Sequence, residues 1–254
     1  MKKHILGANL LCFFSLFFIG KSFGQAASVD STNLQKIASQ FYKSIGEESR
    51  LYNGHEYQPY DPHIKNNALF PYDAKSWTAG AVDYDGVDYK NVPIMYDVYK
   101  DVVVALLYNH FSMFSLLSER VHDFSFSGHH FIRLNADQIN NDKSGITTGF
   151  YEQLYAGKTE ILAKRKKTLQ NSSTAVAAPE TFFEESNNYY LKKGNTYYKI
   201  SSKGSILKIL KDKKNELQKY FRQNNINYGD NPEYAMAQMA SYYDHLSNQD
   251  VGLK

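Results

Sequence analysis

The sequence predicts an α+β domain, in which an antiparallel β-meander sheet is flanked by an N-terminal helix and a C-terminal helix pair. Two observations support this: helical periodicity appears near both ends of the chain, and short apolar runs separated by turn dipeptides fill the middle. The 254 residues are 43% hydrophobic and 22% charged, enough for one sizeable core. This composition excludes a disordered, collagen-like or multispanning protein.

Residues 1–24 have the pattern of a secretory signal peptide. Lys2 and Lys3 precede an apolar run, and small residues, Ser22 and Gly24, come before a cut ahead of Gln25. An uncleaved anchor is the alternative, but the run is shorter than the roughly 20 residues that span a bilayer. We therefore expect an exported protein, periplasmic or outer-membrane-associated, with no transmembrane span after cleavage and a single domain over residues 25–254.

Removing the leader changes the charge and the cysteine count. The leader carries three lysines and no acid, so 26 basic and 26 acidic residues remain. The basic excess is discarded, and with it the electrostatic case for nucleic acid. Cys12 is the chain's one cysteine, so the mature protein is expected to have no disulfide, no thiol nucleophile and no zinc bound through sulfur.

The elements before residue 120 are predicted from periodicity and turn residues. Residues 33–45 are amphipathic, with Ser31 or Thr32 as N-cap and Gly46 beyond the end, which predicts a helix. Residues 47–77 are aperiodic and read as an ordered loop with one short strand. Asp85-Gly86 predicts a two-residue hairpin. Residues 102–117 lack a cap and are interrupted, which favours two strands over a helix.

The later elements are two hairpins and a stretch of ambiguous character between them. Residues 121–134 alternate, which indicates a strand pair or one strand bent at Gly128. Residues 150–163 form a hairpin turning at Ala156-Gly157. Its continuation, residues 164–167, is charged on both faces, so it is expected to leave the core or form an exposed edge. Residues 171–179 read as a loop tip, and residues 189–200 as another hairpin.

Two helices are predicted at the end of the chain. Ser205 is the expected N-cap of a helix running to about residue 224, with a strongly basic outer face. Asp230 or Asn231 is the expected cap of the next helix, with Pro232 in its first turn.

Four segments resemble exported proteins of Bacteroidota that have no assigned activity. These are YNGHEY at 52–57, GHHFIRL at 128–134, GFYEQLYAG at 149–157 and LKDKK at 210–214. The resemblance covers most of the mature chain. It implies that the protein is exported, and it gives no information about a catalytic or binding activity.

Metal sites are weakly indicated, and we expect no metal and no cofactor. His129 and His130 are adjacent, and adjacent side chains of a strand point to opposite faces. One packed and one surface histidine is therefore the expected arrangement. Asp83, Asp85 and Asp88 look superficially like a calcium loop, but the closing Glu of an EF-hand is missing.

No catalytic group is predicted, because no nucleophile is placed beside a base by a recognisable motif. Ser205 spells S-x-x-K with Lys208, but its expected capping role explains it. A hydrolase would require His129 or His130 to converge with Asp123 and a serine in one cleft.

Aromatic residues concentrate in the aperiodic segment, and this is the most informative anomaly in the sequence. Rings on irregular segments are good contact groups for sugars, peptides or acyl chains. The alternative is a lid packed onto the sheet. The predicted ligand-binding residues are Tyr52, Tyr57, Tyr60 and Trp77, with Lys213, Lys214 and Arg222 as an electrostatic rim.

Three functions follow from these observations. The leading hypothesis is a non-enzymatic envelope protein that acts through the Tyr-rich surface on an envelope protein, glycan or lipid. The second is a periplasmic carrier of a lipid or other amphiphile, in which the meander curls around an apolar cavity. The third is a hydrolase.

Overall fold

A computed structural model describes residues 50–71, 77–107, 109–139, 144–174 and 177–251, together with Ile37, Gln40 and Ser44. The chain divides into two compact units, Met1–Ala38 and Ser39–Lys254, and every element below lies in the second. The predicted leader lies outside the described residues. So does the predicted helix over residues 33–45, apart from those three isolated positions.

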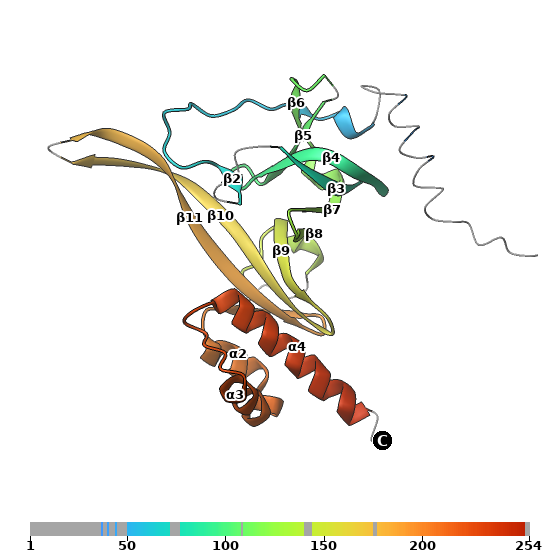
Figure 1. Ribbon diagram of the computed structural model, residues 1–254, viewed down its shortest axis with the longest axis vertical. Coiled ribbons are helices and arrows are strands. Elements are labelled where there is room, and N and C mark those ends of the chain that lie inside the picture. Colours follow the sequence, from blue (N-terminus) through green and yellow to red (C-terminus); the bar gives the residue numbers. More distant parts are fainter. Residues whose placement is uncertain are drawn as a thin grey trace, which may run out of the picture. The chain divides into compact units, whose positions relative to one another are not determined.

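Most of the described chain forms one antiparallel sheet of 12 strands in the order β1-β6-β5-β4-β3-β7-β8-β9-β10-β11-β12, with β2 paired to β4 (Figure 1). Together with three α-helices in the described residues, this agrees with the predicted α+β class. The strands are β1 His55–Glu56, β2 Leu69–Phe70, β3 Thr78–Tyr84, β4 Val87–Asp97, β5 Val102–Leu106, β6 Met113–Ser115, β7 Val121–Phe126, β8 His129–Leu134, β9 Gly149–Ala156, β10 Thr159–Thr174, β11 Ala177–Lys193 and β12 Thr196–Ile200.

Local turn chemistry explains the hairpins. Asp85 and Gly86 adopt φ of 54° and 74° between β3 and β4, and Ser127 and Gly128 adopt 51° and 80° between β7 and β8. Two successive positive φ values are the requirement of the tight turn whose twist matches paired strands. The hairpin at Asp85-Gly86 and the two strands within residues 102–117 are confirmed. Residues 121–134 are a strand pair rather than one bent strand.

The sheet interior is filled with aromatic rings. Phe124 stacks on Phe131 with ring centroids 4.8 Å apart, and Tyr96 and Phe150 lie against Phe124 at 5.2 and 5.1 Å. All four are at most 1% exposed. Such pairs add to the stabilisation from apolar burial, so this part of the meander encloses packed side chains.

The C-terminal helices are α2 Lys203–Ile209, α3 Lys214–Gln223 and α4 Pro232–Val251, and the first two replace one predicted helix. Ser202, not Ser205, is the N-cap of α2, and Ser205 completes the capping box. A 3-10 turn, η6 Lys211–Lys213, separates α2 from α3. Asp212 in this turn binds Lys193 at 3.0 Å and the Tyr243 hydroxyl at 2.9 Å, contacts that hold the break in place.

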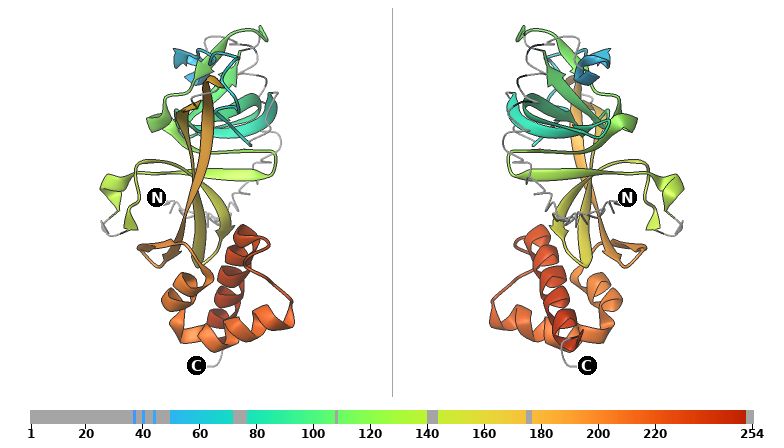
Figure 2. Two further views of the ribbon diagram at one scale, coloured as in Figure 1. Left: turned by 90° about the vertical axis from the view of Figure 1, so that its left-hand side faces the viewer. Right: turned by 90° about the vertical axis from the view of Figure 1, so that its right-hand side faces the viewer.

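The helices pack where β10 begins and β11 ends (Figures 1 and 2). Their apolar faces form one cluster with Ile161, Leu191 and Ile200 of the sheet. Asp244 of α4 is buried and accepts hydrogen bonds from the backbone and side chain of Thr159. Asn231 accepts from the Tyr234 amide at the start of α4, as expected for its cap.

The charged segment at residues 164–167 does not leave the core, contrary to the prediction. It continues β10, and the strands extend through most of the predicted loop tip, to Thr174 and from Ala177. Lys164 binds Asp101 at 2.7 Å, and Lys167 donates to the carbonyls of Asn67 and Leu69. Lys166 is exposed, whereas Lys164, Arg165 and Lys167 each have a partner, the condition for burying charge.

Arg165 carries the most connected of these charges. Its Nε lies 2.6 Å from Glu152 of β9, and its Nη1 and Nη2 lie 2.6 and 3.0 Å from the two oxygens of Glu233 of α4. Tyr189 of β11 donates to Glu233, and His129 of β8 lies 2.5 Å from Glu152. Only 8% of the Arg165 side chain and 4% of the Glu152 side chain are exposed. This ion network joins the helices to the sheet.

We expect Arg165→Leu to lower the free energy of unfolding by about 3–5 kcal/mol, because it leaves the buried Glu152 carboxylate without its cation. Urea unfolding followed by circular dichroism measures the loss. The matched control is Lys166→Leu, which also replaces a cation by leucine, at an exposed neighbour, and should shift stability by no more than about 0.5 kcal/mol. Equal losses in the two variants would contradict the role of the network.

The same ion network predicts that the free energy of unfolding decreases as the pH falls. Burial raises the pKa of Glu233, but hydrogen bonds from Arg165 and Tyr189 outweigh burial, so its pKa lies below the usual 4.5. The folded state therefore keeps the carboxylate where the unfolded chain takes up a proton. This contribution is present above the ordinary pKa and is lost as pH falls through the folded value.

We expect Glu233→Gln to flatten the fall in stability between about pH 5 and pH 3, measured by urea unfolding across that range. The exposed Glu184→Gln is the control and should leave the slope unchanged. If Glu233→Gln retains the wild-type slope, this carboxylate does not contribute to acid unfolding.

Candidate functional site

Two of the predicted aromatic residues converge on one buried carboxylate. Tyr57 and Tyr60 follow β1, and their hydroxyls donate to Oδ2 of Asp97 at 3.0 and 2.8 Å. Asp97 ends β4 and is fully buried, and its Oδ1 accepts from the Lys100 amide at 2.9 Å. A carboxylate with three donors is well satisfied, so Asp97 anchors the loop that follows β1.

Lys100 reinforces this arrangement from above the rings. Its ammonium lies 4.6 Å from the ring centroids of both Tyr57 and Tyr60 and 3.3 Å from the Gln58 carbonyl. A cation over the face of an aromatic ring is attracted to it. The two rings are therefore held on their hydroxyl ends by Asp97 and on their faces by Lys100.

The rest of the loop is fastened to the long β10–β11 hairpin. Lys65 exchanges backbone hydrogen bonds with Thr181 and Phe183 of β11, at 2.9 and 3.0 Å. The Asn66 side chain donates to the Phe183 carbonyl at 3.0 Å. On β10, the buried Lys167 ammonium holds the carbonyls of residues 67 and 69. Partners that are 98 or more residues away in the sequence therefore shape this loop.

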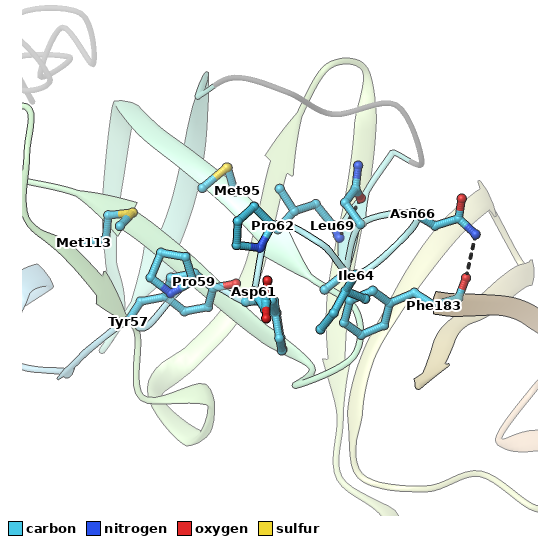
Figure 3. A pocket seen from close by; sticks show the side chains of 13 residues that line it. Tyr57, Pro59, Asp61, Pro62, Ile64, Asn66, Leu69, Met95, Met113 and Phe183 are labelled. Atoms are coloured by element: carbon cyan, nitrogen blue, oxygen red, sulfur yellow. Dashed lines mark hydrogen bonds between the residues drawn. The ribbon is translucent and has the colours of Figure 1, made fainter. Parts of the chain in front are cut away.

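Between the loop and the sheet lies a pocket of about 300 Å³ (Figure 3). Its deeper wall is formed by buried Tyr57, Ala68 and Phe183, and its outer wall by exposed Pro59 and Pro62. Most of the lining is apolar. The lining residues are Tyr57, Pro59, Tyr60, Asp61, Pro62, Ile64, Asn66, Asn67, Ala68, Leu69, Met95, Met113 and Phe183.

The pocket-lining tyrosines offer apolar surface rather than polar handles. Burial, and then the neighbouring Asp97, raise the pKa of Tyr57 and of Tyr60 far above the ordinary value. Both phenols therefore stay neutral across the physiological range, and both hydroxyl protons are committed to Asp97. Phe183 packs edge-on against Tyr60 at 5.1 Å. We refer to Tyr57, Tyr60 and Phe183 as the ring wall.

The other predicted binding residues lie elsewhere. Tyr52 packs against the aromatic core of the sheet, and Trp77, half-buried just before β3, does not line the pocket. Lys213 belongs to η6, and Lys214 and Arg222 belong to α3. The helices meet the opposite end of the β10–β11 hairpin from the segment that holds Lys65, so these cations do not form a rim around the ring wall.

Several pocket residues were not found from the sequence. Asp97 and Met95 follow the predicted turn at Asp85-Gly86, and Met113 lies in the predicted strands within residues 102–117. Phe183 lies between the predicted loop tip and the last predicted hairpin. Only the pairing of distant strands brings them to the loop.

The adjacent histidines fall on opposite faces of β8, as expected. Their side chains are 35% and 44% exposed, so neither is fully packed. Within the described ranges, no group of three or more His, Cys, Asp or Glu residues is placed to hold a metal ion. Asp85, from the superficial calcium pattern, binds Arg120 at 3.2 Å and forms the β3–β4 turn.

The structure provides only part of the catalytic geometry that the hydrolase hypothesis requires. His130 Nε2 lies 3.3 Å from Asp123, and Ser125 sits opposite His130 in the β7–β8 register, on the same face. The other ring nitrogen, Nδ1, lies 3.2 Å from Gln153 Oε1. A catalytic triad needs one ring nitrogen on the acid and the other on the nucleophile, and here glutamine occupies the second position.

In the parts of the chain that the structure describes, no helix has the length and apolar character to cross a bilayer. Comparison with known proteins found no matching family model, no matching curated protein and no matching solved structure.

We expect Asp97→Asn to loosen the pocket loop, because neutral acceptors form weaker bonds than a carboxylate does. The amides of Tyr57 and Lys65, bonded to the carbonyls of Met113 and Thr181, should exchange hydrogen faster. The free energy of unfolding should fall by about 1–3 kcal/mol. The control is Asp88→Asn at an exposed strand position. Unchanged protection at both amides would show that Asp97 does not hold the loop.

Proposed function

We propose that this chain is an exported, non-enzymatic envelope protein that binds an apolar group of a ligand or partner in the pocket beside the ring wall. One observation carries the proposal: both tyrosine hydroxyls at the pocket are consumed by Asp97, so the rings present apolar surface to whatever enters. The expected export rests on the leader sequence.

The lining favours an aliphatic or aromatic group over a sugar. Sugar recognition needs several hydrogen-bonding side chains aimed at ring hydroxyls, and the side chains that meet in the pocket are mainly Pro, Met, Leu, Ile and aromatic. Asp61 and Asn66 are exposed at the loop. A few polar groups around an apolar interior are typical of small-molecule and side-chain pockets.

The carrier hypothesis is the less favoured alternative. A carrier buries most of its ligand, and small-molecule sites span roughly 300–1,000 Å³, so a pocket of about 300 Å³ is at the lower limit. The sheet interior, where the carrier hypothesis placed a cavity, holds the stacked rings of Phe124 and Phe131. An acyl end fits the pocket better than a whole lipid.

We expect the dye 1-anilinonaphthalene-8-sulfonate to bind the folded protein and Met113→Trp to weaken that binding by at least about tenfold, or 1.4 kcal/mol. The larger side chain fills the pocket from β6. Fluorescence titration measures the affinity, and urea unfolding verifies that the variant is folded.

Tyr198→Trp, on β12 and outside the pocket lining, is the matched control and should bind the dye as the wild type does. Dye binding that is equal in both variants, or absent in the wild type, would refute the pocket as an apolar site. If Met113→Trp alone weakens dye binding, native mass spectrometry of protein from its own cells is the measurement that identifies the natural occupant.

A further inference from the structure

A second surface, formed by α2 and α3, gathers cations around a groove. The segment from residue 203 to residue 222 carries seven basic and two acidic residues. Between α2 and α3 lies a groove of about 380 Å³. Its lining, which we call the lysine groove, comprises Gly204, Leu207, Lys208, Lys211, Lys214 and Gln218.

The break between the helices creates this groove. In one continuous helix, residues 204 and 218 would lie about 21 Å apart along the axis, at 1.5 Å per residue, and the lysines would form a stripe. The turn at η6 instead folds α3 back beside α2, where Lys203 of α2 lies 4.8 Å from the Phe221 ring of α3. The three lysines then border one concavity.

The lysines of the groove are electrostatically uncompensated. Lys208, Lys211 and Lys214 are exposed, and none forms an ion pair with another described residue. Asp212, the acid nearest to them in sequence, is bound by Lys193 and Tyr243. Three unpaired cations around one groove create a positive potential that attracts anions.

The apolar residue at the base of the lysine groove and the lysines around it indicate which kind of anion the groove can bind. Leu207 is 6% exposed and lies at the base of the groove, so the site combines apolar contact with charge. The lining contains no arginine, the residue suited to bidentate recognition of a single carboxylate or phosphate. Lysine stems lie along apolar surface while the ammonium reaches outward, which suits the headgroup layer of a membrane.

We infer that the lysine groove docks the protein on anionic phospholipid headgroups. The phosphates of the headgroups contact the three ammonium groups, and the apolar floor covers the adjoining glycerol and upper acyl segment. This surface is separate from the ring wall, and its function does not depend on what the pocket binds.

The test is binding of protein purified from its own cells, in the N-terminal form in which it accumulates there, to vesicles of phosphatidylglycerol and phosphatidylcholine in equal parts. Pure phosphatidylcholine vesicles measure binding that is independent of charge. We expect binding to the anionic vesicles to fall by roughly 100-fold in a triple variant, at about fivefold for each lysine. That variant carries Lys208→Gln, Lys211→Gln and Lys214→Gln.

The matched control removes three exposed lysines that also lack ion pairs among the described residues and lie outside the groove. It should lose less than about threefold, because these side chains do not line the groove and their charges are partly screened from the contact. The control variant carries Lys158→Gln, Lys166→Gln and Lys199→Gln.

Each remaining outcome overturns the inference. Equal losses in the two triple variants would show an effect of net charge alone. Equal binding of wild type to both vesicle types would exclude headgroup charge as the contact. Binding of inorganic phosphate at millimolar concentration, with no binding to vesicles, would indicate a site for free anions. Binding to polyglutamate, with no binding to vesicles, would indicate an acidic protein partner.

Discussion

The constraint on which the structure depends is the pairing of three buried or half-buried cations along β10. Lys164, Arg165 and Lys167 follow one another closely, and each reaches a different part of the molecule: Asp101 after β4, Glu233 of α4, and the loop carbonyls of residues 67 and 69. A buried charge without a partner costs several kcal/mol. The sheet, the helices and the pocket loop are therefore each held to the same strand.

The pocket and the lysine groove differ in whether their polar groups are paired within the protein. At the pocket, Asp97, Tyr57 and Tyr60 satisfy one another, so the cavity that remains is apolar. At the groove, Asp212 is committed to Lys193 and Tyr243, and Lys208, Lys211 and Lys214 form no ion pair with another described residue. The pocket presents mainly apolar surface and the groove presents positive charge, so the two proposed contacts differ in their chemistry.

Part of the candidate site was accessible from sequence because the signal was local. The density of rings in an aperiodic segment singled out Tyr57 and Tyr60, which do meet in the pocket. Tyr52 and Trp77 shared that signal, yet the fold directs Tyr52 to the core and keeps Trp77 out of the pocket. Phe183 and Met113 complete the lining through strand pairings that no local pattern reports.

The sequence by itself determined the hairpins, since residue pairs such as Asp85-Gly86 accept the positive φ that a tight turn demands. It likewise determined the start of α4, where the Asn231 side chain caps the first turn. Tertiary structure alone decided that residues 164–167 stay inside and that the basic helix breaks at η6. The physical reason is the same in both cases: the partners, Glu152, Glu233, Lys193 and Tyr243, are distant in the chain, and a charged side chain is held in place only where the fold supplies hydrogen-bonding or oppositely charged partners.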